Sequence, residues 1–180
     1  MILGLDISTT RIGYCLLEDD GLYIDIGHIE LSKIDNFYMK CVEFRKFLDM
    51  LKCEYDVHND PFYVFVEKPL MMFKSNESMA QVISLLQRFN AVCCYLVQSE
   101  LDIEPQLVME ITARKNVGIK VPKGVKKLDK KKYVLDFVKS LGTVPDSKWE
   151  LKRTGTPKDF CYDQADAFVI AKAGTTLIAP

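Results

Sequence analysis

The first thirty residues alternate between short apolar segments and polar turns. Residues 2–7 are almost entirely apolar and predict a buried strand. A Ser-Thr-Thr turn leads to a second predicted strand over residues 11–17, and an Asp-Asp-Gly turn leads to a third over residues 22–29. Three sequential strands joined by such short turns predict an antiparallel meander.

After the meander the hydrophobic period changes from that of a strand to that of a helix. Apolar residues recur at helical spacing over residues 34–54. Residues 62–66 form a near-continuous apolar run that ends at Glu67, which is typical of a central strand covered on both faces. The remaining predicted elements are a helix over 78–99, a strand over 106–110, a helix over 130–141 and a helix over 159–173 closed by Gly174. This order predicts an α/β fold in one domain, residues 1–180, with a mixed five-stranded sheet flanked by helices.

Composition narrows the class of protein. The chain has 180 residues, of which 48% are hydrophobic and 27% charged, and this balance excludes extensive disorder. The longest mostly apolar stretch, residues 89–97, is about half of the roughly 20 residues that a membrane span needs. The chain opens directly on a predicted strand with no secretory signal, so we expect a cytoplasmic protein of a bacterium or a virus-infected host, an organelle being the alternative.

The six cysteines predict neither a zinc site nor a disulfide framework. They include no C-x-x-C pair, and the two histidines do not lie near them at a ligand-like spacing. Several of the cysteines lie in apolar stretches, as reduced core cysteines do in cytosolic proteins.

Four acids occupy positions where packing alone would favour other residues. Asp6 is in the middle of the first strand, Glu67 ends the most hydrophobic one, and Asp163 and Asp166 share a face of the last helix. Burying such acids costs several kcal/mol unless a cation compensates, and oxygen ligands suit Mg²⁺ or Mn²⁺. Any one of these acids could instead be a helix cap or part of a structural ion pair, but four independent caps are a poor explanation of the set.

Three sequence motifs that contain these acids resemble a known family. Residues 4–14 (GLDISTTRIGY), 65–69 (FVEKP) and 162–167 (YDQADA) resemble, in order and separation, the motifs of the RuvC family of Holliday junction resolvases, which have a ribonuclease H-like fold. The resemblance implies that Asp6, Glu67, Asp163 and Asp166 hold two Mg²⁺ ions about 3.5–4 Å apart, with Mn²⁺ as an alternative. Many family members have glycine where this chain has Ser8, which leaves the shape of that turn open.

A basic segment interrupts an otherwise acidic chain. The net charge of the whole chain is −1, but residues 114–132 carry nine basic residues and one acid, so the rest of the chain carries −9. Such a run is often only a solvated face. Its glycines and proline favour a mobile loop over residues 111–127, and its position beside the acids favours binding to a phosphate backbone. The candidate DNA-binding residues are Arg114, Lys115, Lys120, Lys123, Lys126, Lys127, Lys130, Lys131 and Lys132. By resemblance, Lys115 and Lys131 act in catalysis by holding the scissile phosphate.

Three other features have two interpretations each. Met72 and Phe73 follow the Glu67 strand and either insert into the DNA at a junction or pack over the core edge. Trp149, in a polar loop, either stacks on DNA or anchors the loop. The helix over 78–99 has more apolar residues than one core-facing stripe needs, which suggests a homodimer interface; these are Met79, Val82, Ile83, Leu86, Phe89 and Leu96.

Together these features predict a metal-dependent endonuclease that resolves four-way DNA junctions by symmetric nicking as a homodimer, without a membrane partner. The first alternative is another ribonuclease H-like nuclease that cuts RNA–DNA hybrids, flaps or forks. A second is an actin-like nucleotide-binding domain, although 180 residues are too few for its two lobes. A third is an inactive DNA-binding scaffold, which the presence of all four acids disfavours.

Overall fold

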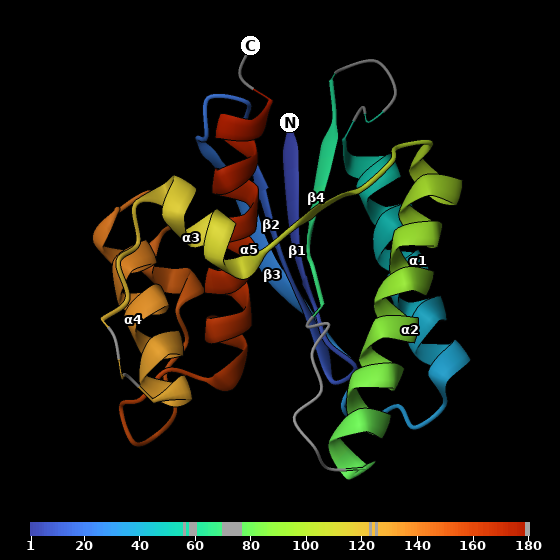
Figure 1. The fold of residues 1–180 in the computed structure, drawn as a ribbon. Helices are drawn as coiled ribbons and strands as arrows, with labels where there is room; N and C mark the ends of the chain where they lie inside the picture. The colour runs from blue at the N-terminus through green and yellow to red at the C-terminus, as the bar shows by residue number, and fades with distance from the viewer. Residues whose placement is uncertain (56, 58–60, 70–76, 123, 125, 179–180) are drawn as a thin grey trace.

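The computed structural model describes residues 1–55, 57, 61–69, 77–122, 124 and 126–178, and its centre is one five-stranded sheet (Figure 1). The strand order is β3-β2-β1-β4-β5. The strands are β1 (Ile2–Ile7), β2 (Arg11–Leu17), β3 (Tyr23–Glu30), β4 (Tyr63–Glu67) and β5 (Gln106–Val108). β1, β2 and β3 pair in antiparallel fashion, whereas β4 pairs parallel with β1 and β5 parallel with β4. The predicted meander and mixed sheet are confirmed, and the described residues contain no second sheet that could form an actin-like second lobe.

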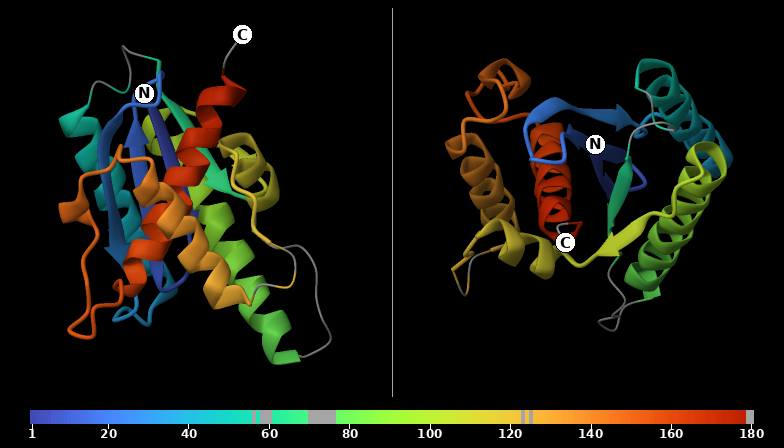
Figure 2. Two further views of the ribbon diagram at one scale, coloured as in Figure 1. Left: turned by 90° about the vertical axis from the view of Figure 1, so that its left-hand side faces the viewer. Right: turned by 90° about the horizontal axis from the view of Figure 1, so that it is seen from above.

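Helices cover both faces of this sheet, as Figure 2 shows from above. On one face α1 (Phe37–Glu54) packs against α2 (Glu77–Leu101). On the other face α5 (Asp159–Leu177) lies directly on the sheet, and α3 (Glu110–Val117) and α4 (Lys127–Ser140) pack on α5. The core divides accordingly into two clusters, one on each side of the sheet.

The alternation along β1 distributes its side chains between these two clusters. Leu3, Leu5 and Ile7 are buried with α1 and α2, whereas Ile2 is buried with α5. Because successive side chains of a strand point to opposite faces, Asp6 faces the α5 side. Asp6, the last residue but one of β1, is thus not part of the apolar core between the sheet and α1.

Two predictions about helices and loops were wrong. The segment 111–127 is not a continuous loop, because residues 110–117 form α3, which ends at Gly118 in the left-handed conformation, and α4 begins at Lys127. Gly174 does not end the last helix, which continues to Leu177. A Cβ atom at Gly174 would lie 2.6 Å from the ring of Phe65, so this glycine allows α5 to approach β4 closely.

Three boundaries also differ from the prediction. β5 is shorter than predicted and ends at Val108, because Glu110 already belongs to α3. β3 begins at Tyr23, since Leu22 still belongs to the preceding turn and is 62% exposed. α1 begins at Phe37, where the side chain of Asn36 caps it by accepting hydrogen bonds from the N–H groups of residues 38 and 39.

α2 is more apolar than the sequence analysis anticipated. By length and composition alone, its stretch Ala80–Leu101 could cross a membrane. The core helix of a soluble protein can meet the same criterion. Phe89, Cys93 and Val97 recur every four residues and are buried against the sheet. The helix therefore has one face in the core and an opposite face that the described residues leave exposed.

Candidate active site

Two glycines allow α5 to lie directly against the strand that carries Asp6. A Cβ atom at Gly4 would overlap the backbone of Ala167 and Ala171, and one at Gly13 would overlap the carbonyl group of Asp163. Gly13 is the partner of Asp6 in the β1–β2 pairing. This close approach brings the acids of the α5 N-terminal half to Asp6.

Glu67 reaches the same place because β4 runs parallel to β1. Leu5 pairs with Val66, so Asp6 and Glu67 are the next residues along two adjacent strands. Glu67 is the last residue of β4. The buried side chain of Asn90 on α2 donates a hydrogen bond to its carbonyl oxygen at 3.3 Å. The sequence-predicted acids of β1, β4 and α5 thus meet at the carboxyl ends of the two parallel strands.

Burial and mutual repulsion raise the pKa values of three of these acids. Burial is the largest cause for Asp6, whose pKa lies well above its ordinary value, and the charges of Glu67 and the α5 acids add to it. Burial, followed by the charge of Asp166, raises the pKa of Glu67 to about 7. Burial also raises the pKa of Asp166 to about 6, against the opposing effect of Lys131 and Arg114. Near neutral pH the cluster therefore retains protons that a bound cation would displace.

The two α5 acids, in contrast, have basic partners. Asp163 accepts hydrogen bonds from Arg11 Nη1 at 2.8 Å and from Lys131 Nζ at 2.9 Å. Asp166 accepts one from Arg114 Nη2 at 3.3 Å and lies 3.8 Å from Lys131 Nζ. The acids, chiefly Asp163, raise the pKa of Lys131 to about 12 in spite of its burial, so this lysine stays charged.

Arg11 is held in place from its other side. Its Nε and Nη2 atoms donate to Glu30 Oε2 at 3.2 and 3.1 Å, and Glu30 also accepts the backbone N–H of Ser32 at 3.0 Å. Hydrogen bonds from Ser32 and Arg11 lower the pKa of Glu30 to about 2. Glu30 on β3 therefore fixes the guanidinium group that contacts Asp163.

The turn between β1 and β2, where the sequence departs from the family pattern, is closed by the serine side chain itself. Ser8 Oγ donates to the Arg11 carbonyl oxygen at 2.7 Å and accepts the Arg11 N–H at 3.0 Å. Lys40 on α1 donates to the Thr9 carbonyl oxygen at 2.5 Å. Ser8 thus supports the turn that begins directly after Asp6 and positions Arg11.

The donor chemistry of the four acids fits a hard divalent cation. Carboxylate oxygens are the ligands that Mg²⁺ and Mn²⁺ prefer, and Asp6 and Glu67 repel each other in the absence of a cation. Within the part of the chain that the structure describes, however, no three His, Cys, Asp or Glu side chains are close enough together to hold a metal ion. Both oxygens of Asp163 contact Arg11 or Lys131 instead, so ion binding requires side-chain rearrangement.

The basic segment divides into residues that face the acids and residues that face solvent. Arg114 on α3 and Lys131 on α4 contact the α5 acids. The exposed basic residues of the segment, among those whose side chains the structure describes, are Lys115, Lys120, Lys126, Lys130 and Lys132. Lys123 lies outside the described residues, as do Met72 and Phe73, and Lys127 is the first residue of α4.

Lys115 and Lys131, which the resemblance assigned the same role, lie in different surroundings. Lys131 is only 34% exposed and contacts Asp163. Lys115 is exposed, and the neighbouring Arg114 is the residue of α3 that reaches Asp166.

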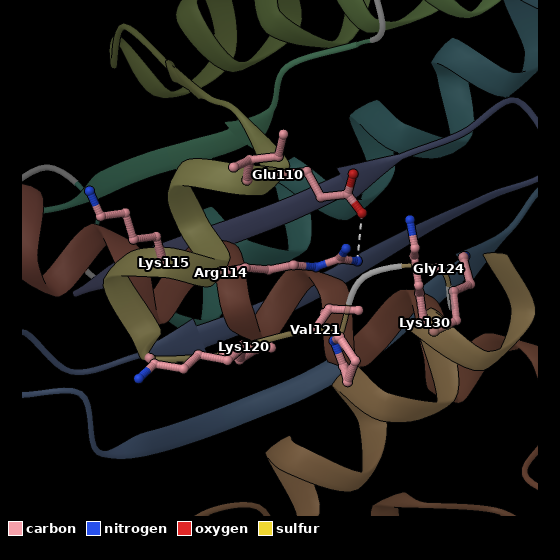
Figure 3. Close-up of a pocket in the computed structure, with 12 residues that line it drawn as sticks. Glu110, Arg114, Lys115, Lys120, Val121, Gly124 and Lys130 are labelled. Atoms are coloured by element: carbon pink, nitrogen blue, oxygen red, sulfur yellow. Dashed lines mark ion pairs between the residues drawn. The ribbon is translucent and has the colours of Figure 1, made fainter. Parts of the chain in front are cut away.

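A pocket of about 1000 Å³ lies beside the acids, between α3, α4 and the chain that connects them (Figure 3). Arg114 and Lys131 both line it, and an ion pair of 2.5 Å joins Arg114 to Glu110 at its edge. The roles of Arg11, Glu30 and Glu110 could not be predicted from the sequence, because they depend on partners that are distant in sequence or on a helix that was predicted as loop.

The side chain of Trp149 is buried and is not available for stacking on DNA. It is 5% exposed and packs in the core cluster of α5. The interpretation of Trp149 as a packing anchor is confirmed, and the DNA-stacking interpretation was wrong.

Comparisons with known proteins decide the fold. No protein-family model and no curated protein sequence matches the chain. Among solved structures, Thermus thermophilus RuvC in complex with a Holliday junction substrate matches with a TM-score of 0.57 and 14% identity, over 96% of this chain and 90% of that chain. This chain has the RuvC fold.

Two further structures agree with this assignment. A second structure of Thermus thermophilus RuvC matches with a TM-score of 0.56 and 15% identity, over 96% of this chain and 91% of that one. The yeast mitochondrial Holliday junction resolvase Ydc2 matches with a TM-score of 0.54 and 12% identity, over 97% of this chain and 77% of that one. The RuvC-like fold that the three sequence motifs predicted is confirmed over nearly the whole chain.

Proposed function

We propose that this protein is a metal-dependent, structure-selective DNA endonuclease that resolves four-way junctions by paired nicks. The proposal rests on one observation, the proximity of four acids to the cationic groups of Arg114 and Lys131. The acids are Asp6, Glu67, Asp163 and Asp166. The RuvC fold, seen with a Holliday junction substrate in the Thermus thermophilus protein, supports the choice of substrate.

In this mechanism Asp6, Glu67, Asp163 and Asp166 would hold Mg²⁺ or Mn²⁺, two ions per site. Bound divalent ions supply a hydroxide nucleophile at neutral pH and stabilise the leaving 3′-oxygen. Glu67 and Asp166 must first lose the protons that they retain near pH 6 to 7. Lys131 and Arg114 then turn from the acids to the scissile phosphate and offset its developing charge.

We assign the exposed apolar residues of α2 to a homodimer interface. Val82 is 65% exposed although it lies on the same helical stripe as the buried Phe89, and Leu85 and Tyr95 are 40% and 68% exposed. Leu86 and Leu96 are only partly buried, whereas Phe89 belongs to the core. A four-way junction has two strands to cut, and a C2 dimer presents two equivalent sites to them. Sedimentation of a monomer at micromolar concentration would overturn this assignment.

A cytoplasmic location, in a bacterium or in a virus-infected cell, is consistent with the cysteines. All six are free thiols in the structure, which suits a reducing compartment.

Cleavage of a panel of synthetic substrates tests the nuclease proposal. The panel contains a four-way junction, a linear duplex, a flap and an RNA–DNA hybrid, each incubated with Mg²⁺ or with EDTA, and Asp6→Asn is the control variant. We expect symmetric nicks in the junction that disappear in EDTA and in the variant. Preferential cutting of the hybrid would favour a ribonuclease H-like activity and overturn the proposal.

A further inference from the structure

Asn90 is a buried polar residue on the side of α2 that packs against the sheet. It is 4% exposed, and its neighbours Phe89 and Cys93 belong to the apolar core. A polar side chain at such a position loses its hydrogen bonds to water and is found there where the protein supplies partners instead. The partners of Asn90 therefore indicate its role.

Both ends of the Asn90 amide group have a partner. The Nδ2 atom donates to the carbonyl oxygen of Glu67 at 3.3 Å, and the Oδ1 atom accepts a hydrogen bond from Cys94 Sγ at 3.6 Å. Because a carbonyl oxygen can only accept, the contact with Glu67 requires the NH₂ group of the amide on that side. Cys94, one turn further along α2, contacts the amide oxygen and favours this orientation.

The carbonyl group of Glu67 lies where the pairing between two central strands ends. The last residue of β4 that pairs with β1 is Val66, so Glu67 is the first residue beyond that ladder. On the other side of β4, the N–H group of Lys68 donates to the Val108 carbonyl oxygen of β5 at 2.8 Å. Asn90 thus supplies a donor to the Glu67 carbonyl at the point where β1 no longer pairs with β4.

This contact reaches Glu67 from the face of the sheet opposite the acids. Phe65 is buried with α5 and Val66 with α2, so the alternation along β4 directs the Glu67 side chain to the α5 side. In Figure 1, α2 and α5 lie on opposite sides of β4. Asn90 therefore holds Glu67 by its backbone, on the face away from the carboxylate.

We propose that Asn90 is a positioning residue for the metal-binding carboxylate of Glu67. By fixing the Glu67 carbonyl group, it limits rotation of the peptide group at the end of β4 and so sets the direction in which the Glu67 side chain leaves the backbone. Residues that hold a metal ligand in its binding orientation contribute to metal affinity. The proposal rests on the proposed nuclease function, in which Glu67 is a metal ligand.

Mg²⁺ titrations of thermal stability without DNA test this role independently of cleavage. Asn90→Leu has a similar volume but no donor, and it should raise the Mg²⁺ concentration that half-saturates the site about tenfold. Asn90→Ala also lacks the donor and should behave in the same way. Asn90→Gln retains a donor, and a pocket of about 510 Å³ beside Asn90 has room for the longer side chain, so this variant should recover a large part of the affinity.

Val97→Ala is the matched control for a general loss of stability. Val97 is buried on the same side of α2, two turns beyond Asn90, so this variant should melt at a lower temperature with an unchanged Mg²⁺ midpoint. A double-mutant cycle tests whether Asn90 acts through Glu67. In the Glu67→Gln background, Asn90→Leu should leave the midpoint unchanged, because the ligand that Asn90 positions is already lost.

Three results would overturn the inference while leaving the nuclease function in place. They are an unchanged midpoint in Asn90→Leu and Asn90→Ala, an equal rise in Val97→Ala, and an equal rise on top of Glu67→Gln. Absence of junction cleavage by the wild-type protein would instead contradict the nuclease function.

Discussion

The strand acids and the helix acids meet at one site but have different electrostatic surroundings. Asp6 and Glu67 lie on adjacent parallel strands. Burial, followed by the charge of Glu67, raises the pKa of Asp6, and burial, followed by the charge of Asp166, raises the pKa of Glu67. Asp163 and Asp166 lie against Arg11, Lys131 and Arg114. Among the described residues no ion pair joins a basic side chain to Asp6 or Glu67, whereas both helix acids have such partners, although burial still raises the pKa of Asp166. Divalent ions would relieve repulsion at the first pair and would compete with side chains at the second.

The largest expected effect is the loss of cleavage when either pair is disrupted. Asp6→Asn and Asp166→Asn should each lower the rate of junction cleavage on the order of a thousandfold, because each removes a charged metal ligand. The measurement is single-turnover cleavage at saturating Mg²⁺.

The two substitutions should differ in their effect on folding, although not in their effect on activity. Asp6→Asn relieves repulsion, whereas Asp166→Asn leaves Arg114 without one of its two carboxylate partners. Equal changes in the free energy of unfolding for both variants would contradict the comparison.

The second prediction concerns Lys131, the cation that contacts both helix acids. Lys131→Ala should slow junction cleavage about a hundredfold, because the variant loses a donor to the developing charge on the scissile phosphate. Lys131→Arg should retain a larger part of the activity. Lys139→Ala, at an exposed lysine near the opposite end of α4, is the matched control, and an equal loss in both alanine variants would refute a special role for Lys131.

The third prediction follows from the raised pKa values of the buried acids Glu67 and Asp166. The native protein binds more protons than the unfolded chain between about pH 4, near the ordinary pKa of these groups, and about pH 7, the pKa of Glu67 in the fold. Without divalent ions, the free energy of unfolding should therefore decrease as the pH rises through this window, by several kcal/mol from these groups together.

Glu67→Gln should remove a large part of this pH dependence and stabilise the metal-free protein at pH 7.5, although it abolishes cleavage. Urea unfolding in EDTA at pH 5.0 and 7.5 measures both effects. Asp146→Asn, at an exposed acid outside the site, is the control. A variant Glu67→Gln that is less stable than the wild-type protein at pH 7.5 would contradict the assignment of Glu67 to an uncompensated pair.

The positions of the four acids could be predicted from sequence because each interrupts a strong local pattern. Asp6 breaks an apolar strand, and Glu67 ends the near-continuous run of β4. The two glycines opposite α5, Gly4 and Gly13, lie in the same motif as Asp6, so the close approach of helix and strand is also encoded locally.

The cationic partners could not be predicted in this way. Arg11 and Asp163 are 152 residues apart in sequence, and only the packing of α5 on β1 and β2 brings them together. α3 has eight residues, and it is followed by Gly118 and Pro122, so local signals favoured a loop. The prediction of Arg114 as a general DNA-binding residue therefore did not include its contact with Asp166.

The smallest expected effect tests the arginine that contacts Asp163. Arg11→Ala should lower the Mg²⁺ concentration that half-saturates the site about fivefold, because the ion no longer competes with the guanidinium group for Asp163 Oδ2. Glu30→Gln should act in the same direction but more weakly, about two- to threefold, since Glu30 contacts Arg11 and not Asp163. Both values come from Mg²⁺ titrations of thermal stability in the absence of DNA, so they do not depend on cleavage. Arg45→Ala, which removes an exposed arginine paired with Glu100 on the opposite side of the sheet, should leave the midpoint unchanged. A higher Mg²⁺ midpoint in Arg11→Ala would show that Arg11 holds Asp163 in position for the ion and does not compete with it, and would contradict the comparison.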